Sequence, residues 1–138
     1  MSRVCPTDAD GDSLMAKTSK ARNVFFVLLG VAALVIKRNY SGPFAEIVYS
    51  YGGNASASFA VYFVVRILTL GWRYGRLVTA SIALLVVELF EATNGFGVMT
   101  NVYDPADFVV NALGVGLALV LDTLVWSRWR GELGRGSQ

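Results

Sequence analysis

The sequence contains no histidine, only one cysteine and few charged residues. Charged side chains make up 16% of its 138 residues and hydrophobic ones 54%, whereas soluble domains average ~25% charged. Without histidine the chain lacks the commonest general base, a common metal ligand and every Ser–His or Cys–His pair. Cys5 alone can form no intrachain disulfide. We therefore expect neither a soluble domain nor a metal or other cofactor.

The hydrophobic residues gather in four segments, at about 21–37, 54–72, 76–92 and 106–126. A helix needs ~20 largely apolar residues to cross a ~30 Å hydrocarbon core, and three of the segments are long enough. The unbroken apolar run of the first segment is shorter, so we expect its basic flanks to reach the interfaces. The pattern predicts an all-α integral membrane protein with four transmembrane helices.

Polar segments flank this membrane domain, which we place at residues 21–130. Residues 1–20 are predicted to form a disordered tail, and residues 131–138 a polar C-terminal tail. The aspartates of the first tail are spaced like the beginning of a calcium-binding loop. However, this segment lacks the glutamate that such a loop needs, and its glycine stands at the wrong position. Met15 is an alternative start that would remove those aspartates.

A secretory signal peptide competes with an uncleaved first helix, because Lys17, Lys20 and Arg22 precede the apolar run. Lys37 and Arg38 follow this run directly, and no small-residue cleavage pattern comes before them. We therefore expect the first helix to stay uncleaved.

Basic residues mark one predicted side of the membrane. Nine of the twelve lie on that side: Arg3, Lys17, Lys20, Arg22, Arg73, Arg76, Arg128, Arg130 and Arg135. The other side has only Lys37 and Arg38, so the positive-inside rule predicts that both termini lie in the cytoplasm. These short clusters at helix ends do not form a nucleic-acid-binding stripe, and anionic membrane lipid suffices as their partner.

A short amphipathic segment lies between the first two spans, on the outer side. Phe44, Ile47, Val48 and Tyr51 have the i, i+3, i+4, i+7 spacing of one helical face. We predict an interfacial or re-entrant helix over about 43–51, ended by the following glycine pair. An irregular loop with aromatic anchors is the alternative.

Three ionisable side chains lie within predicted spans: Arg66, Glu88 and Asp122. Each costs at least ~2.5–3.5 kcal/mol on insertion, so such groups are normally paired or turned toward a polar interior. At ~1.5 Å rise per residue, an arginine side chain at position 66 can reach either acid. The sequence therefore does not decide between Glu88 and Asp122 as its partner.

Polar residues also gather near the predicted outer ends of the last two spans. Glu88 and Glu91 share one helical face, and Asp107 and Asn111 share another. One interpretation is an acidic pocket for a proton, a cation or a cationic lipid or peptide headgroup. The other is structural: Arg66 neutralises Glu88, Asn111 bonds across the bundle, and the remaining acids are solvated.

Small residues repeat every four positions in the last span, in Gly114 with Ala118 and in Ala112 with Gly116. Such stripes allow close helix approach. Packing of this span on the second one is predicted, and it would favour pairing of Arg66 with Asp122. A homo-oligomer is the alternative use of the stripe.

Some of these residues also carry a family resemblance. In the second half they are Val87-Glu88-Leu89, Asp107, Asn111 and Gly114, and this pattern resembles the VanZ-like family. In the first half they are Arg38-Asn39-Tyr40-Ser41-Gly42-Pro43, Glu46, Tyr51-Gly52, Phe63 and Arg66, and these resemble a related family of small uncharacterised bacterial membrane proteins. The resemblance implies a four-helix inner-membrane protein, with a founding member associated with glycopeptide resistance. VanZ-like proteins usually carry an arginine between Glu91 and Asp107, and this chain has none.

Three classes of function remain. The favoured one is a non-enzymatic cell-envelope protein that binds a lipid-linked or cationic amphiphile at the outer acidic pocket. The alternative is a small oligomeric transporter or channel that uses Arg66, Glu88 and Asp122. An enzyme is the least favoured, because no nucleophile and base pair is identifiable.

Overall fold

The computed structural model describes residues 8–72, 75–93 and 104–135, which form four α-helices and one short 3-10 helix. The elements are α1 (Asp8–Ile36), η1 (Lys37–Asn39), α2 (Ala45–Leu68), α3 (Gly75–Ala92) and α4 (Pro105–Arg135). The all-helical class predicted from the sequence is confirmed. Predictions that fall on residues 1–7, 73–74, 94–103 and 136–138 lie outside the described residues.

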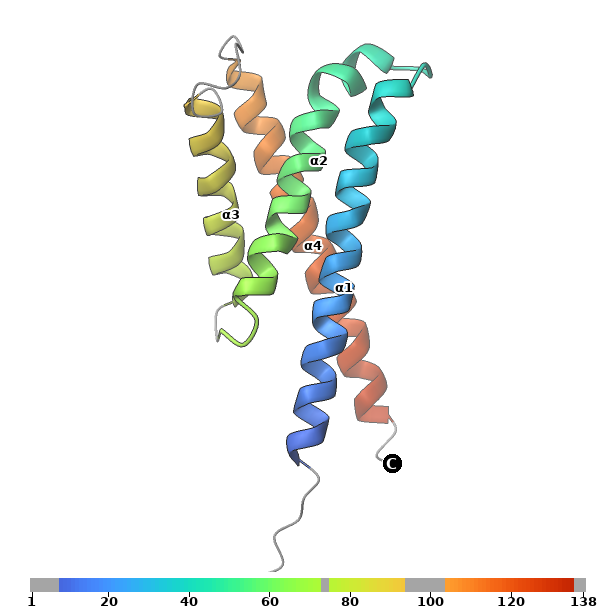
Figure 1. The fold of residues 1–138 in the computed structure, drawn as a ribbon, viewed down its shortest axis with the longest axis vertical. Coiled ribbons are helices and arrows are strands. Elements are labelled where there is room, and N and C mark those ends of the chain that lie inside the picture. The colour runs from blue at the N-terminus through green and yellow to red at the C-terminus, as the bar shows by residue number, and fades with distance from the viewer. Residues whose placement is uncertain (1–7, 73–74, 94–103, 136–138) are drawn as a thin grey trace, which may run out of the picture.

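Helix α2 is the centre of the bundle, because it contacts α1, α3 and α4. In Figure 1, α4 passes behind α2. The N-terminal part of α1 and the C-terminal part of α4 lie near each other, beyond the lower ends of α2 and α3. Among the described residues, no Cα atom of α1 comes within 8 Å of one in α4. These two helices therefore meet only through their side chains.

Two helical stretches are long and apolar enough to cross a membrane, Ala16–Asn39 and Pro105–Ser127. Only 11% and 28% of their most apolar windows are buried inside the bundle. Most of this apolar surface therefore faces outward, which is unfavourable in water and is expected where lipid surrounds the helix. Helices α2 and α3 are not among these stretches; α2 carries Arg66, and α3 carries Arg76, Glu88 and Glu91 within only 18 residues.

The first and last helices are longer than the sequence predicts. Residues 8–20, expected to be disordered, belong to α1, and α4 continues to Arg135 through most of the expected C-terminal tail. Negative charge is favourable at a helix N-terminus, and the first turns of α1 contain Asp8, Asp10 and Asp12. With 29 residues, α1 is about 43 Å long, more than enough to span a bilayer.

The outer segment 43–51 is not a separate helix. Phe44 has φ 63°, a left-handed turn that precedes α2, and the helix then runs from Ala45 through Leu68 without interruption. Glycine disfavours a helix by only about 1 kcal/mol, and Gly53 is buried against Lys37, whose ammonium nitrogen a Cβ would strike. The glycine pair is therefore a packing position within α2 and does not end a helix.

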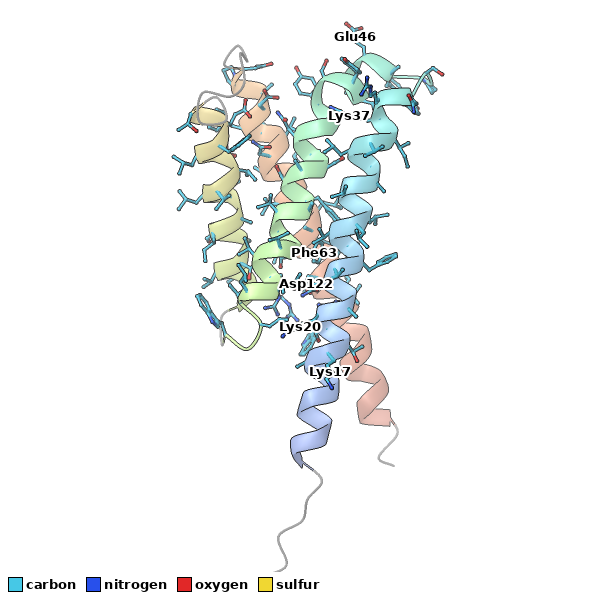
Figure 2. The ribbon with its side chains drawn as sticks, viewed as in Figure 1. Lys17, Lys20, Lys37, Glu46, Phe63 and Asp122 are labelled. Carbon is cyan, nitrogen blue, oxygen red and sulfur yellow. The ribbon has the colours of Figure 1, made fainter. Side chains whose placement is uncertain are left out.

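The core of the bundle is aromatic. Phe63 is fully buried in α2, and its ring lies 4.6 Å from that of Phe26 and 5.1 Å from those of Phe59 and Tyr62. Small residues complete the core from the other helices, with Ala83 in α3 and Ala118 in α4 both at 0% exposure. In Figure 2, Phe63 lies midway along the bundle, with Lys17 and Lys20 toward one end and Lys37 and Glu46 at the other.

At Gly114, α4 packs closely on α2. A Cβ at this position would lie 2.5 Å from the Ala55 carbonyl oxygen and 3.1 Å from the Ser58 Cβ. Gly114 and Ala118 are both buried, whereas a Cβ at Gly116 would meet nothing within 4 Å. Of the two small-residue stripes, the one that contains Gly114 and Ala118 faces α2.

We expect Gly114→Ala to destabilise the bundle by about 1–3 kcal/mol, because the added methyl group must push α2 away from α4. Gly116→Ala is the matched control, and it should be neutral or stabilising by up to ~1 kcal/mol through helix propensity alone. Unfolding by denaturing detergent, followed by circular dichroism, measures both. Equal effects of the two substitutions would contradict this packing.

Candidate functional site

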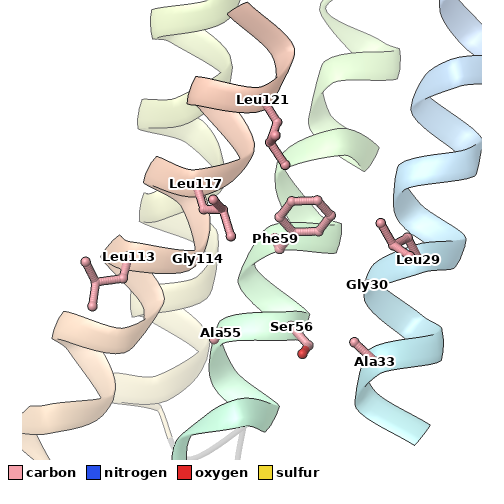
Figure 3. A pocket seen from close by; sticks show the side chains of 10 residues that line it. All are labelled: Leu29, Gly30, Ala33, Ala55, Ser56, Phe59, Leu113, Gly114, Leu117 and Leu121. Carbon is pink, nitrogen blue, oxygen red and sulfur yellow. The ribbon is translucent and has the colours of Figure 1, made fainter. Parts of the chain in front are cut away.

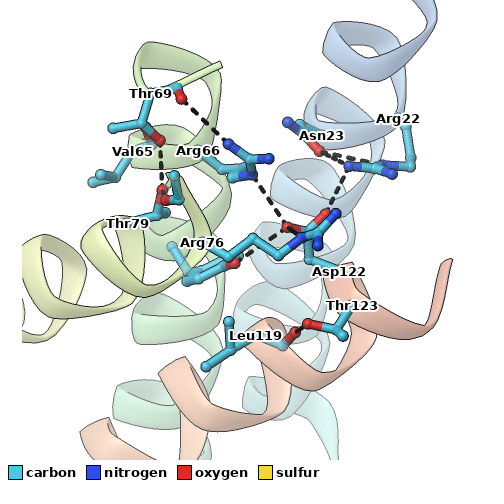
Figure 4. Close-up of polar contacts among 12 residues, drawn as sticks. Arg22, Asn23, Val65, Arg66, Thr69, Arg76, Thr79, Leu119, Asp122 and Thr123 are labelled. Atoms are coloured by element: carbon cyan, nitrogen blue, oxygen red, sulfur yellow. Dashed lines mark hydrogen bonds and ion pairs between the residues drawn. The ribbon is translucent and has the colours of Figure 1, made fainter. Parts of the chain in front are cut away.

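One carboxylate connects all four helices. Asp122 of α4 has a side chain with 0% exposure, and Arg22 Nη2 of α1 donates to its Oδ1 at 2.7 Å. Its Oδ2 accepts from Arg66 Nε of α2 at 3.1 Å and from Arg76 Nε of α3 at 3.2 Å (Figure 4). The Tyr62 hydroxyl donates to the same oxygen at 3.3 Å. We call Arg22, Arg66, Arg76 and Asp122 the arginine cluster.

Each arginine of the cluster has a second contact. Arg22 donates to Asn23 Oδ1 from Nη2 at 3.0 Å and from Nε at 3.3 Å. Arg66 Nη1 donates to the Thr69 carbonyl oxygen at 3.3 Å. The guanidinium carbon of Arg76 lies 5.2 Å from the centre of the Trp126 ring, a cation–π contact. These contacts help to hold the three side chains in place around Asp122.

The connection between α2 and α3 brings two of these arginines together. Gly71 has φ +94°, a conformation that glycine adopts without steric cost. A Cβ on Gly75 would lie 2.9 Å from Arg66 Nη1, so the missing side chain leaves room for that guanidinium. The hydroxyl groups of Thr69 and Thr79 are hydrogen-bonded across the connection and tie the two helix ends together.

The structure places Arg66 beside Asp122, one of its two candidate partners from the sequence, and gives it no ion pair with Glu88 among the described residues. The structural interpretation in which Arg66 neutralises Glu88 is therefore wrong. Sequence reasoning missed Arg22 and Arg76, because it treated them as interfacial residues that mark orientation. The sequence does contain a signal for this convergence. At ~1.5 Å rise per residue, Asp122 lies about 22 Å along the helix from Asp107, at the depth that the basic side chains at the helix ends can reach.

A second polar group lies near the opposite end of the bundle. Ser58 Oγ of α2 donates to Asn111 Oδ1 of α4 at 2.6 Å, and both residues are buried. The Asn111 side chain also interacts with the carboxyl group of Glu88 of α3. One carboxyl oxygen of Glu88, Oε2, is buried and has no hydrogen-bond partner among the described residues. Asn111 thus hydrogen-bonds across the bundle to α2 and lies beside the carboxyl group of Glu88 from α3.

A cavity of about 460 Å³ opens beside this group. Its polar lining consists of Lys37, Asn54, Ser58, Glu91 and Asn111, and its walls are otherwise small or apolar residues of α1, α2 and α3. We call it the outer cavity. Of the four residues predicted for an acidic pocket, Glu91 and Asn111 line it and Glu88 adjoins it through Asn111.

The outer cavity differs from the predicted acidic pocket in two respects. Lys37 contributes a positive charge, so the lining is mixed in sign. Its ammonium nitrogen donates to the Tyr49 carbonyl oxygen at 3.3 Å, which holds it at the end of the bundle. Asp107 is buried one turn before Asn111 on α4 and is not part of the lining.

A second hollow of about 360 Å³ is apolar (Figure 3). It lies on the face of α2 between α1 and α4, where Gly30, Phe59 and Leu117 are among its lining residues. Its lining contains Ser56 but no charged side chain. Within the part of the chain that the structure describes, no three His, Cys, Asp or Glu residues gather in a way that could hold a metal ion.

Comparisons of the chain with protein-family models, with curated proteins and with solved structures find no match. The resemblance to the VanZ-like family therefore stays a hypothesis that rests on the residues quoted above.

We expect Asp122→Asn to destabilise the protein by about 3–5 kcal/mol, because it leaves three arginines buried beside one another without a negative partner. Asp104→Asn makes the same chemical change at the start of α4, where Asp104 Oδ1 accepts from the Ala106 amide at 2.9 Å. Asparagine caps helices as well as aspartate, so this control should stay within ~0.5 kcal/mol of the parent.

Denaturation in detergent micelles measures both variants. An Asp122→Asn protein as stable as the Asp104→Asn control would show that the cluster does not hold the helices together.

Proposed function

We propose that this protein spans the bacterial inner membrane with all four helices and binds an amphiphile with a cationic headgroup in the outer cavity. The observation that carries the proposal is that cavity, in which Glu91, Asn111 and Ser58 meet apolar walls at one end of a lipid-facing bundle. The proposal keeps the envelope role and the lipid-linked or free cationic ligand that the sequence favours.

The charges of the bundle support the proposed orientation. Lys17, Lys20, Arg22 and Arg76 lie toward the end where α1 starts and α4 finishes, and Lys37 and Arg38 lie at the other. By the positive-inside rule the end with the arginine cluster is cytoplasmic. The outer cavity then opens near the outer leaflet, where lipid-linked envelope precursors and external cationic amphiphiles are accessible.

Labelling with a membrane-impermeant maleimide tests this orientation, because the chain has only Cys5. We expect the native Cys5 to stay unlabelled in intact cells and to react after permeabilisation. A Cys5→Ser, Ser41→Cys variant should react in intact cells, since Ser41 lies between η1 and α2 at the other end of the bundle. Labelling of both proteins on the same side would contradict the four-span topology.

The lining of the outer cavity suits an amphiphile better than an inorganic ion. The side chains of Leu34, Val61, Val86 and Phe90 provide apolar surface for a hydrocarbon chain. A headgroup amine can approach Glu91, while Lys37 can meet a carbonyl or other acceptor of the same headgroup. Sites for small ligands commonly combine apolar walls with a few polar groups that set orientation.

The interior of the bundle argues against transport through a single copy. Between the two polar groups lie Phe59, Tyr62 and Phe63, with at most 8% exposure, and their rings pack against one another. A pathway that uses Arg66, Glu88 and Asp122 would have to pass this aromatic layer. The transporter alternative therefore requires an oligomer with a path between copies.

The proposed site is tested with dodecyltrimethylammonium as the cationic amphiphile and dodecyl maltoside as the neutral detergent. We expect native mass spectrometry to show the cation bound to the parent, with occupancy reduced severalfold in Glu91→Gln because the Coulomb attraction between the carboxylate and the ammonium group is lost. Glu46→Gln removes a glutamate from the exposed first turn of α2 and should leave binding unchanged.

Two results would contradict the site. One is equal loss of binding in the Glu91→Gln and Glu46→Gln proteins, which would indicate general surface attraction. The other is parent protein that retains no more cation than neutral detergent.

A further inference from the structure

The arginine cluster holds more positive charge than its carboxylate can neutralise. Arg22, Arg66 and Arg76 have side-chain exposures of 14%, 11% and 27%, and Asp122 is their only ion-pair partner among the described residues. Within the described side chains, two positive charges therefore remain uncompensated in a largely buried group. Such charges are costly to bury and are normally matched by a counter-charge.

The cluster is also rich in hydrogen-bond donors and poor in acceptors. Three guanidinium groups carry roughly fifteen N–H donors, whereas the acceptors found for them in the described residues belong to Asp122, Asn23 and Thr69. Among the described residues, Arg76 uses only Nε in a hydrogen bond, so the two terminal nitrogens of its guanidinium group have no acceptor there.

A buried amide next to the cluster shows the same imbalance. Asn23 is 0% exposed, and its Oδ1 accepts two hydrogen bonds from Arg22. Its Nδ2, a donor, is buried without a hydrogen-bond partner among the described residues. A buried donor of this kind normally finds an acceptor, so the site lacks an acceptor rather than a donor.

A small hollow lies between the two helices that meet beside the cluster. It is lined by Thr18, Ser19 and Arg22 of α1 and by Trp126 of α4. Two hydroxyl groups and a guanidinium thus border one hollow, and Trp126 also stacks on Arg76. Lys17 and Lys20 lie on the same stretch of α1 and are exposed. Each of these polar groups carries an N–H or O–H donor, and none of them is acidic.

We propose that the arginine cluster binds a phosphate group, which supplies the missing negative charge and the missing acceptors. Guanidinium groups suit this ligand because their planar forks bond two phosphate oxygens at once. Asp122 holds the three arginines in place and prevents their mutual repulsion, and the phosphate bridges their outward nitrogens near the hollow bordered by Thr18, Ser19 and Trp126. This site is at the opposite end of the bundle from the outer cavity.

The phosphate can belong to a phospholipid headgroup or to a free phosphate ion, and the chemistry of recognition is the same. Trp126 favours the interface between hydrocarbon and headgroups, the level at which lipid phosphates lie. Binding at this position would close the junction between α1 and α4, whose described Cα atoms do not come within 8 Å of one another.

The test uses the full chain in a maltoside detergent, titrated with dioctanoyl phosphatidic acid or with dioctanoylglycerol. These two lipids share their tails and differ in the phosphate. We expect native mass spectrometry to show phosphatidic acid bound about tenfold more tightly, the value of one charge-assisted hydrogen bond. The Arg76→Gln variant should lose this preference, while two arginines still neutralise Asp122.

Arg38→Gln is the matched control, because it removes the same charge from the exposed η1 at the other end. It should keep the preference for phosphatidic acid. If Arg76→Gln does not accumulate, Arg76→Lys keeps the positive charge but not the planar fork, and it should bind phosphatidic acid severalfold more weakly than the parent at a similar Tm.

Inorganic phosphate added at constant ionic strength distinguishes the two sources. If it displaces phosphatidic acid, the site accepts free phosphate; if it does not, the site requires the lipid, and both results support a phosphate site. Equal binding of phosphatidic acid and dioctanoylglycerol would overturn the proposal. Equal losses in the Arg38→Gln and Arg76→Gln proteins would overturn it too, because the effect would then be one of net charge.

Discussion

The burial of Asp122 among three arginines is the constraint on which the rest of the structure depends. Each of the other helices contributes one arginine to this carboxylate, so a single residue fixes where α1, α2 and α3 lie around α4. The interaction matters most for α1 and α4, which have no close backbone contact among the described residues. In lipid, where apolar packing gives helices little preference for one another, such polar contacts determine which helices associate.

This constraint also separates the molecule into two ends with different chemistry. Close packing at Gly114 and the aromatic layer around Phe63 fill the space between them. One end has a positive excess near three arginines, and the other has a cavity that contains both Lys37 and Glu91. The two proposed ligands, a phosphate and a cationic amphiphile, follow from this separation and can be tested independently.

The sequence predicts the helical class well, because long apolar segments separated by polar residues leave few alternatives. The same patterning predicts the close packing of the fourth segment on the second, since Gly114 can be read from its four-residue spacing. Helix ends are predicted less well: residues 8–20 have no apolar periodicity, yet they are helical. The glycine pair at 52–53 suggests a helix end, but its close contact with Lys37 is a tertiary effect that local sequence does not contain.

The candidate sites show the same division between local and tertiary information. The small-residue stripe already favours Asp122 over Glu88 as the partner of Arg66, whereas the convergence of Arg22 and Arg76 on the same carboxylate depends on how α4 crosses behind α2. Lys37 is close to the predicted pocket for a similar reason, since it comes from a helix that the pocket prediction does not include. Residues far apart in the chain meet only when helix order and crossing are known.

The most direct measurement of the central claim is a double-mutant cycle between Arg66 and Asp122. The free energies of unfolding of Arg66→Gln, Asp122→Asn and the double variant would be compared with that of the parent. A direct pair in one network predicts a coupling energy of about 1–3 kcal/mol. The double variant should then be less destabilised than the sum of the single changes, because removal of Arg66 relieves part of the uncompensated charge. Effects that add to within ~0.5 kcal/mol would contradict the account.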